Sequence, residues 1–291
     1  MKQLLSVSIA AGLLTPACGG AARPIGGPVV ITNEGARLAG TLSLPESAHA
    51  PLPAVVLVHG SGRTTRDEQR FMRDRLLAMG VAVLAYDKRG VGESTGEYDN
   101  VGVRTSPERM PLLGRDALAA LRVLEGRPGF DSRRLGFVGV SQAGWIIPFA
   151  LASAKPGEVR FAVIQSGPAG SVGQEDAYSE ATGDGFRPHD TLTVAQIDAR
   201  VDAYSGPPGF DNMPSLQGDR TPILWLLGEA DESIPVRHTR RNLEALARSG
   251  VPISVRTYPD ANHALMTPAG PTGYWDDVRE WLKAQGIVGS R

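Results

Sequence analysis

The segment around Ser141 contains the residue types of a nucleophilic site. A strand-like apolar run leads into Gly-Val-Ser-Gln-Ala-Gly at 139–144, and a helix-compatible run, 145–152, follows directly. A serine held between a strand and a helix sits on a sharp turn that exposes its hydroxyl and requires small neighbours. The usual pattern is Gly-x-Ser-x-Gly; here the second small residue is Ala143, with Gly144 one place later. The sequence therefore predicts a nucleophile elbow with Ser141 as the nucleophile.

A serine hydroxyl needs an adjacent base, and His263 occupies the position expected for one. Activation requires a histidine that a carboxylate holds in the right tautomer. His263 follows the last strand-like segment, 252–258, and the other four histidines occupy positions that surface or turn roles explain. A loop at the carboxyl end of a parallel strand opens onto the same edge as the elbow. We therefore predict His263 as the general base.

The carboxylate that orients the histidine should follow the preceding strand, because Ser, acid, His is the chain order when an elbow of this kind lies on a parallel sheet. The segment 228–235, Gly-Glu-Ala-Asp-Glu-Ser-Ile-Pro, follows the strand-like run 222–227. It contains three carboxylates, Glu229, Asp231 and Glu232. Position alone does not choose among them.

Strands and helices alternate along most of the chain. We expect helices at 66–79, 114–125, 145–152, 194–204, 237–249 and 274–285, each following a short apolar strand or lying between two strands. This alternation predicts a mostly parallel sheet with helices on both faces. The segments 29–32 and 37–44, joined by Asn-Glu-Gly, predict an antiparallel extension at one edge. An insert at about 168–221 is rich in Gly, Pro, Asp and Ser, which is typical of a cap or lid.

Five motifs in a fixed order resemble one superfamily. They are His-Gly-Ser-Gly at 59–62, Asp-Lys-Arg-Gly-Val-Gly-Glu-Ser at 87–94, the serine motif, Gly-x-x-Asp-x-x-Ile-Pro at 228–235 and Asn-His-Ala at 262–264. The sequence is thereby identified as similar to the α/β-hydrolase superfamily, in its serine esterase and serine peptidase-like branches, which include dienelactone hydrolases and prolyl oligopeptidases. The resemblance spans residues 59 to 263 and implies the α/β-hydrolase fold. It also implies that Asp231 is the triad acid, with Ile234 standing where valine is commoner.

A tetrahedral intermediate needs two donors aimed at its oxyanion. The backbone N–H of Gln142, directly after the nucleophile at a helix N-terminus, is the first candidate. The resemblance places the second donor in the His-Gly-Ser-Gly turn, which implies Ser61 N–H, with Gly62 as the alternative. His59 is expected to shape that turn. We assign no catalytic role to the segment 87–90, which is either a structural signature beside the site or a glycine turn with surface charges.

Composition excludes several classes of function. The chain has 30 basic and 31 acidic side chains with no basic stripe, so nucleic acid is not an expected partner. Histidines and carboxylates do not cluster at metal-ligand spacing, and no complete phosphate-binding glycine pattern is present, so we predict neither metal nor cofactor. The expected partner is a small-molecule ester or a peptide substrate. The sequence does not indicate an oligomeric state.

The N-terminal residues, 1–22, have the pattern of an export signal. Lys2 is followed by an apolar run, 4–14, and by small residues around Cys18, the only cysteine. Either Cys18 is lipidated, as in bacterial lipoproteins, or the ordinary signal peptidase cleaves near Ala17 or Ala22. Both routes predict one extracytoplasmic domain over 23–291 without a disulfide. That domain would be periplasmic, secreted or lipid-anchored at the bacterial cell envelope, and would touch a membrane only through the lipid.

These observations predict an exported serine hydrolase that cleaves carboxylic esters through an acyl-enzyme. The same triad serves amide bonds, so an aminopeptidase or acyl-peptidase is the near alternative. The sequence ahead of the core is too short for a β-propeller, and we take this as favouring small soluble substrates. A non-catalytic binding protein of the same fold is the second alternative. The retention of Ser141, Asp231 and His263 argues against it.

Overall fold

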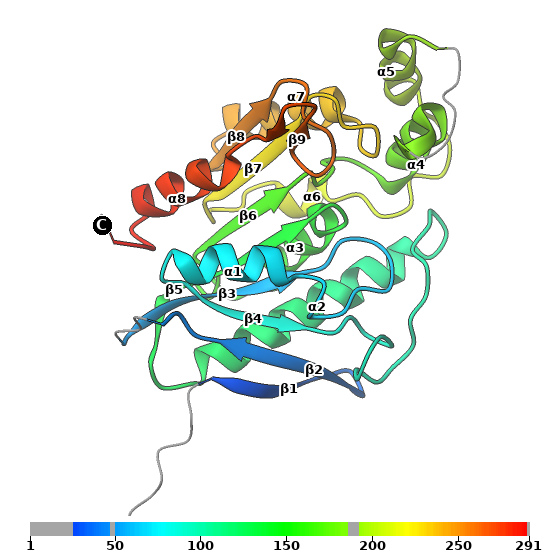
Figure 1. Ribbon diagram of the computed structural model, residues 1–291. Helices are drawn as coiled ribbons and strands as arrows, with labels where there is room; N and C mark the ends of the chain where they lie inside the picture. Colours follow the sequence, from blue (N-terminus) through cyan, green and yellow to red (C-terminus); the bar gives the residue numbers. More distant parts are fainter. Residues whose placement is uncertain (1–25, 47–49, 186–191, 290–291) are drawn as a thin grey trace, which may run out of the picture.

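Eight strands of the described chain form one sheet. The structure is a computed structural model and describes residues 26–46, 50–185 and 192–289, so the expected export signal with Cys18 lies outside the described residues. Figure 1 shows the sheet, whose strand order is β1-β2-β4-β3-β5-β6-β7-β8. Its strands are β1 (Gly27–Asn33), β2 (Ala36–Ser43), β3 (Leu52–Val58), β4 (Ala82–Tyr86), β5 (Phe130–Val140), β6 (Phe161–Gln165), β7 (Ile223–Gly228) and β8 (Ile253–Tyr258). The β1–β2 and β2–β4 pairs are antiparallel, and all pairs from β4 to β8 are parallel.

Helices cover both faces of this sheet (Figure 1). The helices are α1 (Arg70–Ala78), α2 (Ser106–Glu125), α3 (Ala143–Ser153), α4 (Val172–Thr182), α5 (Val194–Asp202), α6 (Met213–Leu216), α7 (Val236–Arg248) and α8 (Tyr274–Ala284), with a short 3₁₀ turn at Gly183–Gly185 and a small hairpin of β9 (Met266–Thr267) and β10 (Gly270–Pro271). Residues of α2, α3 and α7 share one apolar cluster with the sheet, and residues of α1 and α8 share the other. The sequence-based prediction of an α/β-hydrolase fold with an antiparallel edge is therefore confirmed.

The central strands are continuous apolar runs because helices bury both of their faces. All seven residues of β3 are buried, as are all of β4, β6 and β7. Such strands hold the loops at their carboxyl ends in fixed positions, and those loops carry the predicted site residues.

Among the longer helices, α2 and α4 differ most from the sequence-based expectation. Helix α2 begins at Ser106 rather than Gly114, with Pro107 in its first turn and Pro111 inside it. Helix α4 was not predicted, because its apolar residues form no clear stripe. Its N-terminus nevertheless carries a sequence signal that could have revealed it: Ser171 and Gln174 form a capping box.

The insert is anchored to the sheet by buried polar contacts. Asn212, which is fully buried, donates to the carbonyls of Gly144 (2.6 Å) and Pro168 (2.8 Å) and accepts from the Gly170 N–H (2.9 Å). Helices α4 and α5 pack against each other beyond the carboxyl ends of the central strands (Figure 1). The insert therefore begins and returns beside the elbow helix α3.

The large apolar side chains of the insert do not pack together in one cluster. Tyr178 packs with Ala181, Ile197 and Val201 in a small core between α4 and α5. Phe210 and Met213 pack against the main core. Among the described helices, none is long and apolar enough to cross a membrane.

Candidate active site

Ser141 occupies a strained turn between β5 and α3. Its φ is +56°, a conformation that a residue with a side chain adopts only when its surroundings hold it there. A Cβ on Gly139 would lie 2.4 Å from the Cβ of Ala143, and one on Gly144 would lie 2.8 Å from the backbone of Gly167. The small residues of the motif thus allow the strand, the turn and the helix to approach closely. This geometry matches the predicted nucleophile elbow.

His263 and Asp231 are hydrogen-bonded. The distance from His263 Nδ1 to Asp231 Oδ2 is 2.8 Å, and the Asp231 side chain has no solvent exposure. The other carboxylate oxygen, Oδ1, accepts from the N–H groups of Ser233 (2.8 Å) and Ile234 (3.2 Å). These contacts fix the carboxylate against His263. Among the three carboxylates of this loop, Glu229 instead contacts Arg240, at 3.3 Å.

The nucleophile and the base come from neighbouring parts of one sheet edge. Ser141 follows β5, Asp231 follows β7 and His263 follows β8, so all three lie at the carboxyl ends of parallel strands. Within the described residues, His263 forms a hydrogen bond to Asp231 and none to Ser141. The structure thus joins the base to the acid and places the serine on the same edge.

The two predicted oxyanion donors belong to segments that meet beside Ser141. Gln142 is the N-cap of α3, where the helix dipole favours negative charge. Ser61 belongs to the turn after β3, and a Cβ on the neighbouring Gly60 would lie 3.5 Å from the Ser141 Cβ. In the part of the chain that the structure describes, neither the Ser61 N–H nor the Gln142 N–H donates to another protein group. Both remain available to a ligand.

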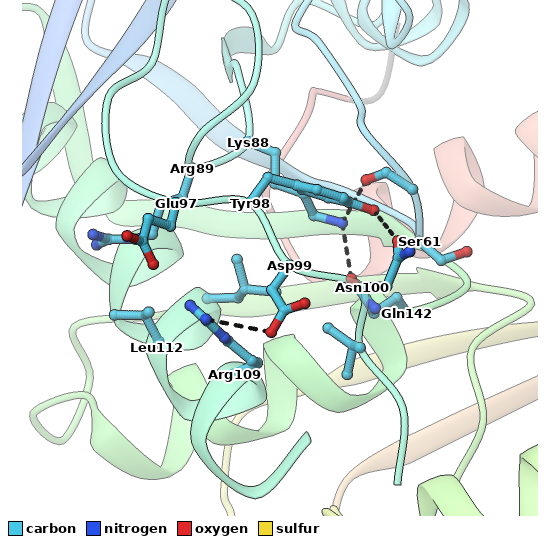
Figure 2. Close-up of a pocket in the computed structure, with 13 residues that line it drawn as sticks. Ser61, Lys88, Arg89, Glu97, Tyr98, Asp99, Asn100, Arg109, Leu112 and Gln142 are labelled. Atoms are coloured by element: carbon cyan, nitrogen blue, oxygen red, sulfur yellow. Dashed lines mark hydrogen bonds and ion pairs between the residues drawn. The ribbon is translucent and has the colours of Figure 1, made fainter. Parts of the chain in front are cut away.

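Ser61, Gly62 and Gln142 line a cavity of about 190 Å³. Figure 2 shows the other walls, which the loop 97–101 and helix α2 provide. Leu112 of α2 supplies apolar surface. Two pairs of polar wall residues contact each other: Arg109 lies 3.4 Å from Asp99, and the Tyr98 hydroxyl donates to Asn100 at 2.8 Å. The cavity can therefore hold a small group attached to a carbonyl at the oxyanion position.

The segment 87–90 differs from the surface turn that the sequence allowed. Asp87, Lys88 and Arg89 are 2, 3 and 7 % exposed. Arg66 Nη1 donates to Asp87 at 2.7 Å, and Arg89 Nε donates to Asp116 at 2.9 Å. The interpretation of these residues as surface charges is therefore wrong; they are buried, and Asp87 and Arg89 each form an ion pair, of which the Arg89–Asp116 pair is buried on both sides.

Lys88 is the functional candidate that sequence reasoning missed. Its Nζ donates to the carbonyl of Gly60 (2.7 Å), the carbonyl of Gly62 (3.1 Å) and Oε1 of Gln142 (2.9 Å). Burial lowers the pKa of Lys88 to about 8. Its place directly after a buried strand is the signal that could have revealed it, because loops at this edge of the sheet surround the site.

His59 supports the same turn from inside. Its Nε2 lies 2.5 Å from the carbonyl of Tyr86, and its ring meets the Tyr86 ring edge-on at 4.4 Å between centroids. Burial, together with the nearby positive charge of Lys88, lowers the pKa of His59 to about 3. The ring is therefore neutral at pH 7 and donates to the carbonyl. This geometry fits the expected role in shaping the turn.

The insert also contacts the site. The hydroxyl of Tyr178, on α4, donates to the backbone carbonyl of Asp231 at 2.8 Å. This contact connects the insert to the acid loop that follows β7. Within residues 26–46, 50–185 and 192–289, no cluster of three or more His, Cys, Asp or Glu side chains could hold a metal ion.

The chain is similar to known proteins in sequence and in fold. The rat (Rattus norvegicus) acylamino-acid-releasing enzyme is 24% identical over 237 residues, which cover 79% of this chain but only 31% of that enzyme. A Pyrococcus furiosus esterase superimposes with a TM-score of 0.65 at 20% identity, covering 94% of this chain and 97% of that one. A dienelactone hydrolase from Anabaena variabilis gives a TM-score of 0.59 at 20% identity, covering 89% of this chain and 97% of that one.

The two structural neighbours, at these identities, show the shared fold. The sequence itself matches a family model, because the model of the prolyl oligopeptidase family aligns with residues 68–285. That range includes the elbow, the acid loop and the histidine loop. The chain is therefore a hydrolase, and it belongs to the prolyl oligopeptidase family.

Proposed function

We propose that this protein is a serine hydrolase that cleaves carboxylic esters of small soluble substrates. The observation that carries the proposal is the buried Asp231 carboxylate hydrogen-bonded to His263 at the same sheet edge as the strained Ser141. An acid, a base and an exposed nucleophile in this order are the parts that acyl transfer requires. The hydrogen bond between nucleophile and base often tightens only when substrate binds.

The proposed reaction has two halves. Ser141 Oγ attacks the ester carbonyl while His263 Nε2 takes its proton, and Asp231 holds the ring through Nδ1. The oxyanion accepts hydrogen bonds from the N–H groups of Ser61 and Gln142. The intermediate collapses, His263 returns the proton to the leaving alcohol, and an acyl-enzyme remains. Water, activated by His263, then attacks the acyl-enzyme and releases the acid and Ser141.

The size and walls of the cavity support a small substrate. About 190 Å³ accommodates a short acyl or alcohol group rather than a long chain, and the cavity opens beside the donors. The esterase of Pyrococcus furiosus and the dienelactone hydrolase share the fold over nearly their whole lengths, and both names describe ester cleavage. Ester hydrolysis is therefore our first choice.

Amide hydrolysis is the second candidate. The chain belongs to a family named for peptidases, and the rat relative is named for releasing acylated amino acids. The chain spans only 31% of that enzyme, so we give this candidate second place.

The test is labelling with a fluorophosphonate beside hydrolysis of p-nitrophenyl esters of increasing chain length. We expect wild type to label and to hydrolyse short esters, and Ser141→Ala to do neither. Labelling without ester hydrolysis would favour the amide reaction, which acyl-amino-acid anilides would then report. A wild type that neither labels nor hydrolyses would contradict the proposal and favour a binding protein of this fold.

We also propose that the chain is exported, with residues 1–22 acting as the signal. Mass spectrometry of the mature protein from its native host tests this. A lipidated Cys18 at the N-terminus would indicate an anchored form, and a start at unmodified Cys18 or at Arg23 would indicate a secreted form. Mature protein that still begins at Met1 or Lys2 would contradict export.

A further inference from the structure

The Lys88 ammonium contacts the peptide unit that carries one of the proposed oxyanion donors. It donates to the carbonyl oxygen of Gly60, at 2.7 Å, and that carbonyl belongs to the same peptide unit as the N–H of Ser61. The cis peptide bond of the described residues is at Ala50–Pro51, so the Gly60–Ser61 unit is trans. In a trans unit the C=O and N–H point in opposite directions. The hydrogen bond from Lys88 therefore directs the Ser61 N–H to the opposite side.

The same ammonium reaches the segment of the other proposed donor. Its second and third contacts are Oε1 of Gln142, at 2.9 Å, and the carbonyl of Gly62, at 3.1 Å. An ammonium has three N–H donors, and these three oxygens use all of them. Figure 2 shows Lys88 at the wall of the cavity, where a dashed line joins its ammonium to the side chain of Gln142. One cation thus joins the turn after β3 to the N-terminus of α3.

The charge of Lys88 is compensated differently from the charges beside it. Asp87 pairs with Arg66, and Arg89 pairs with Asp116. Within the described residues, Lys88 forms no ion pair with a carboxylate, and its partners are neutral oxygens. Burying an ammonium without a counter-charge is costly. Because no carboxylate neutralises it, the Lys88 charge polarises the Gly60–Ser61 peptide. This polarisation makes the Ser61 N–H a stronger hydrogen-bond donor.

We propose that Lys88 is a positioning residue of the oxyanion hole: it orients the Gly60–Ser61 peptide and Gln142 so that their two N–H groups converge on one oxyanion. The proposal rests on the proposed serine hydrolase function and adds to it the residue that preorganises the donors. It predicts that loss of the ammonium affects the transition state more than substrate binding, because the oxyanion forms only during the reaction.

The experiment uses the full chain with Lys88→Met, Gln142→Met and the double variant. Both substitutions keep the approximate length of the side chain, and Gln142→Met keeps the backbone N–H. We expect Lys88→Met to lower kcat for a p-nitrophenyl ester by roughly 100-fold, the lower end of the effect of losing one oxyanion donor, with KM changed less than about threefold. Affinity for a trifluoromethyl ketone, whose adduct with Ser141 carries an oxyanion, should fall in parallel with kcat/KM.

The double variant separates positioning from general destabilisation. Gln142→Met alone should lower kcat by roughly tenfold, because it removes one of the three contacts of Lys88. In the absence of Lys88 the same substitution should lower kcat little further, because the effects of substitutions within one hydrogen-bond network are not additive. Fully additive losses would contradict the proposal. If Lys88→Met does not fold, the tenfold loss in Gln142→Met with unchanged KM carries the test, and unaltered kcat in that variant overturns it.

Arg122→Met is the matched control. It removes the guanidinium that donates to the largely buried carboxylate of Glu158 at 2.6 Å. Glu158 lies just before β6, so this ion pair is at the end of the sheet opposite to the proposed active site. We expect it to lower the unfolding midpoint while leaving kcat within threefold of wild type. A folded Lys88→Met that also keeps kcat within threefold would overturn the role of Lys88 and leave the serine hydrolase function intact. A wild type that reacts with neither fluorophosphonate nor ester would overturn both.

Discussion

At the scale of single residues, the environment of Asp231 supports its proposed role as the acid. Three donors surround its carboxylate: His263 and the N–H groups of Ser233 and Ile234. The side chain is completely buried, so these hydrogen bonds are not exchanged with water. A carboxylate held in this way can fix the tautomer of His263 and stabilise the imidazolium that forms during proton transfer.

Asp231→Asn should lower kcat by about four orders of magnitude with little change in KM, because an amide favours the wrong tautomer of His263. Glu229→Gln, two residues away in the same loop, is the control and should keep kcat close to wild type, since Glu229 contacts Arg240. Steady-state kinetics on a p-nitrophenyl ester measures both. Equal losses in the two variants would reject the assignment of the acid.

At this scale, the sequence predicts positions more readily than environments. Ser141 and His263 could be proposed because a short motif and a place after a strand specify them. Asp231 needed the resemblance, since three carboxylates share its loop. The place of Lys88 after a buried strand indicates that it lies near the site, but nothing in a charged loop sequence states that its side chain turns inward and loses contact with water.

At the scale of secondary-structure elements, α4 connects the insert to the catalytic loops. Its N-terminus is closed by the Ser171–Gln174 capping box, and its last turn contacts the acid loop through Thr182. Helix α5 has an equivalent box, formed by Thr193 and Gln196. Both boxes satisfy N–H groups that a helix start leaves free.

Ser171→Ala should therefore lower the local stability of α4 by about 1 kcal/mol, the usual effect of removing an N-cap. Hydrogen exchange should become roughly five times faster in α4 and remain unchanged in α5. Thr193→Ala, the matched variant, should give the reverse pattern. Unchanged exchange in α4 on substitution of Ser171 would show that packing, not the cap, holds this helix.

Elements with a strong apolar pattern could be predicted, and those without one could not. The eight strands of the main sheet follow from continuous apolar runs, such as β3, or from alternation with turn signals, as in β1 and β2. Helix α4 has only scattered apolar residues, and α2 contains Pro111, which disfavours a helix interior. Tertiary packing against α3 compensates for that proline, and no local pattern reports such packing.

At the scale of the whole molecule, buried polar groups connect the sheet to the site loops. The Asp116 carboxylate, on α2, accepts from Arg89 and from Asn33 of β1, at 2.9 and 2.7 Å. His59 joins the turn after β3 to the end of β4. Folding of the core and formation of the site are therefore coupled. Conditions that disturb these buried groups should lower both the stability of the fold and the activity of the site.

Acid should destabilise the protein in part through His59. The unfolded side chain titrates near pH 6.5, whereas burial lowers the pKa in the folded state to about 3. Below pH 6.5 the unfolded state therefore takes up a proton that the folded state excludes, so the free energy of unfolding falls as pH decreases from 6.5 towards 3. His59→Gln keeps a side-chain donor near the Tyr86 carbonyl but does not titrate.

Urea unfolding at pH 7 and pH 5 measures this contribution. The decrease in the free energy of unfolding between the two pH values should be smaller in His59→Gln than in wild type, whatever the stability of the variant at pH 7. His238→Gln is the comparison variant, in which a different histidine is replaced. His238 lies on α7, and its Nδ1 is 2.9 Å from Oδ1 of Asp202 on α5. An equal pH dependence in wild type and His59→Gln would show that His59 does not control acid stability.

The attachment of the insert has a consequence for how such an enzyme can diversify. The chain leaves the sheet after Gly167 and returns to the same place, where the Val172 N–H donates to the Phe210 carbonyl at 2.9 Å and Ser171 bridges Asp211. The segment between these points is thus a closed excursion whose ends stay fixed whatever its length. Mutation, insertion or recombination within it can alter the surface beside the acid loop, which Tyr178 contacts, without disturbing the strands of the sheet. Selection can therefore explore new substrates at a low risk of losing the fold.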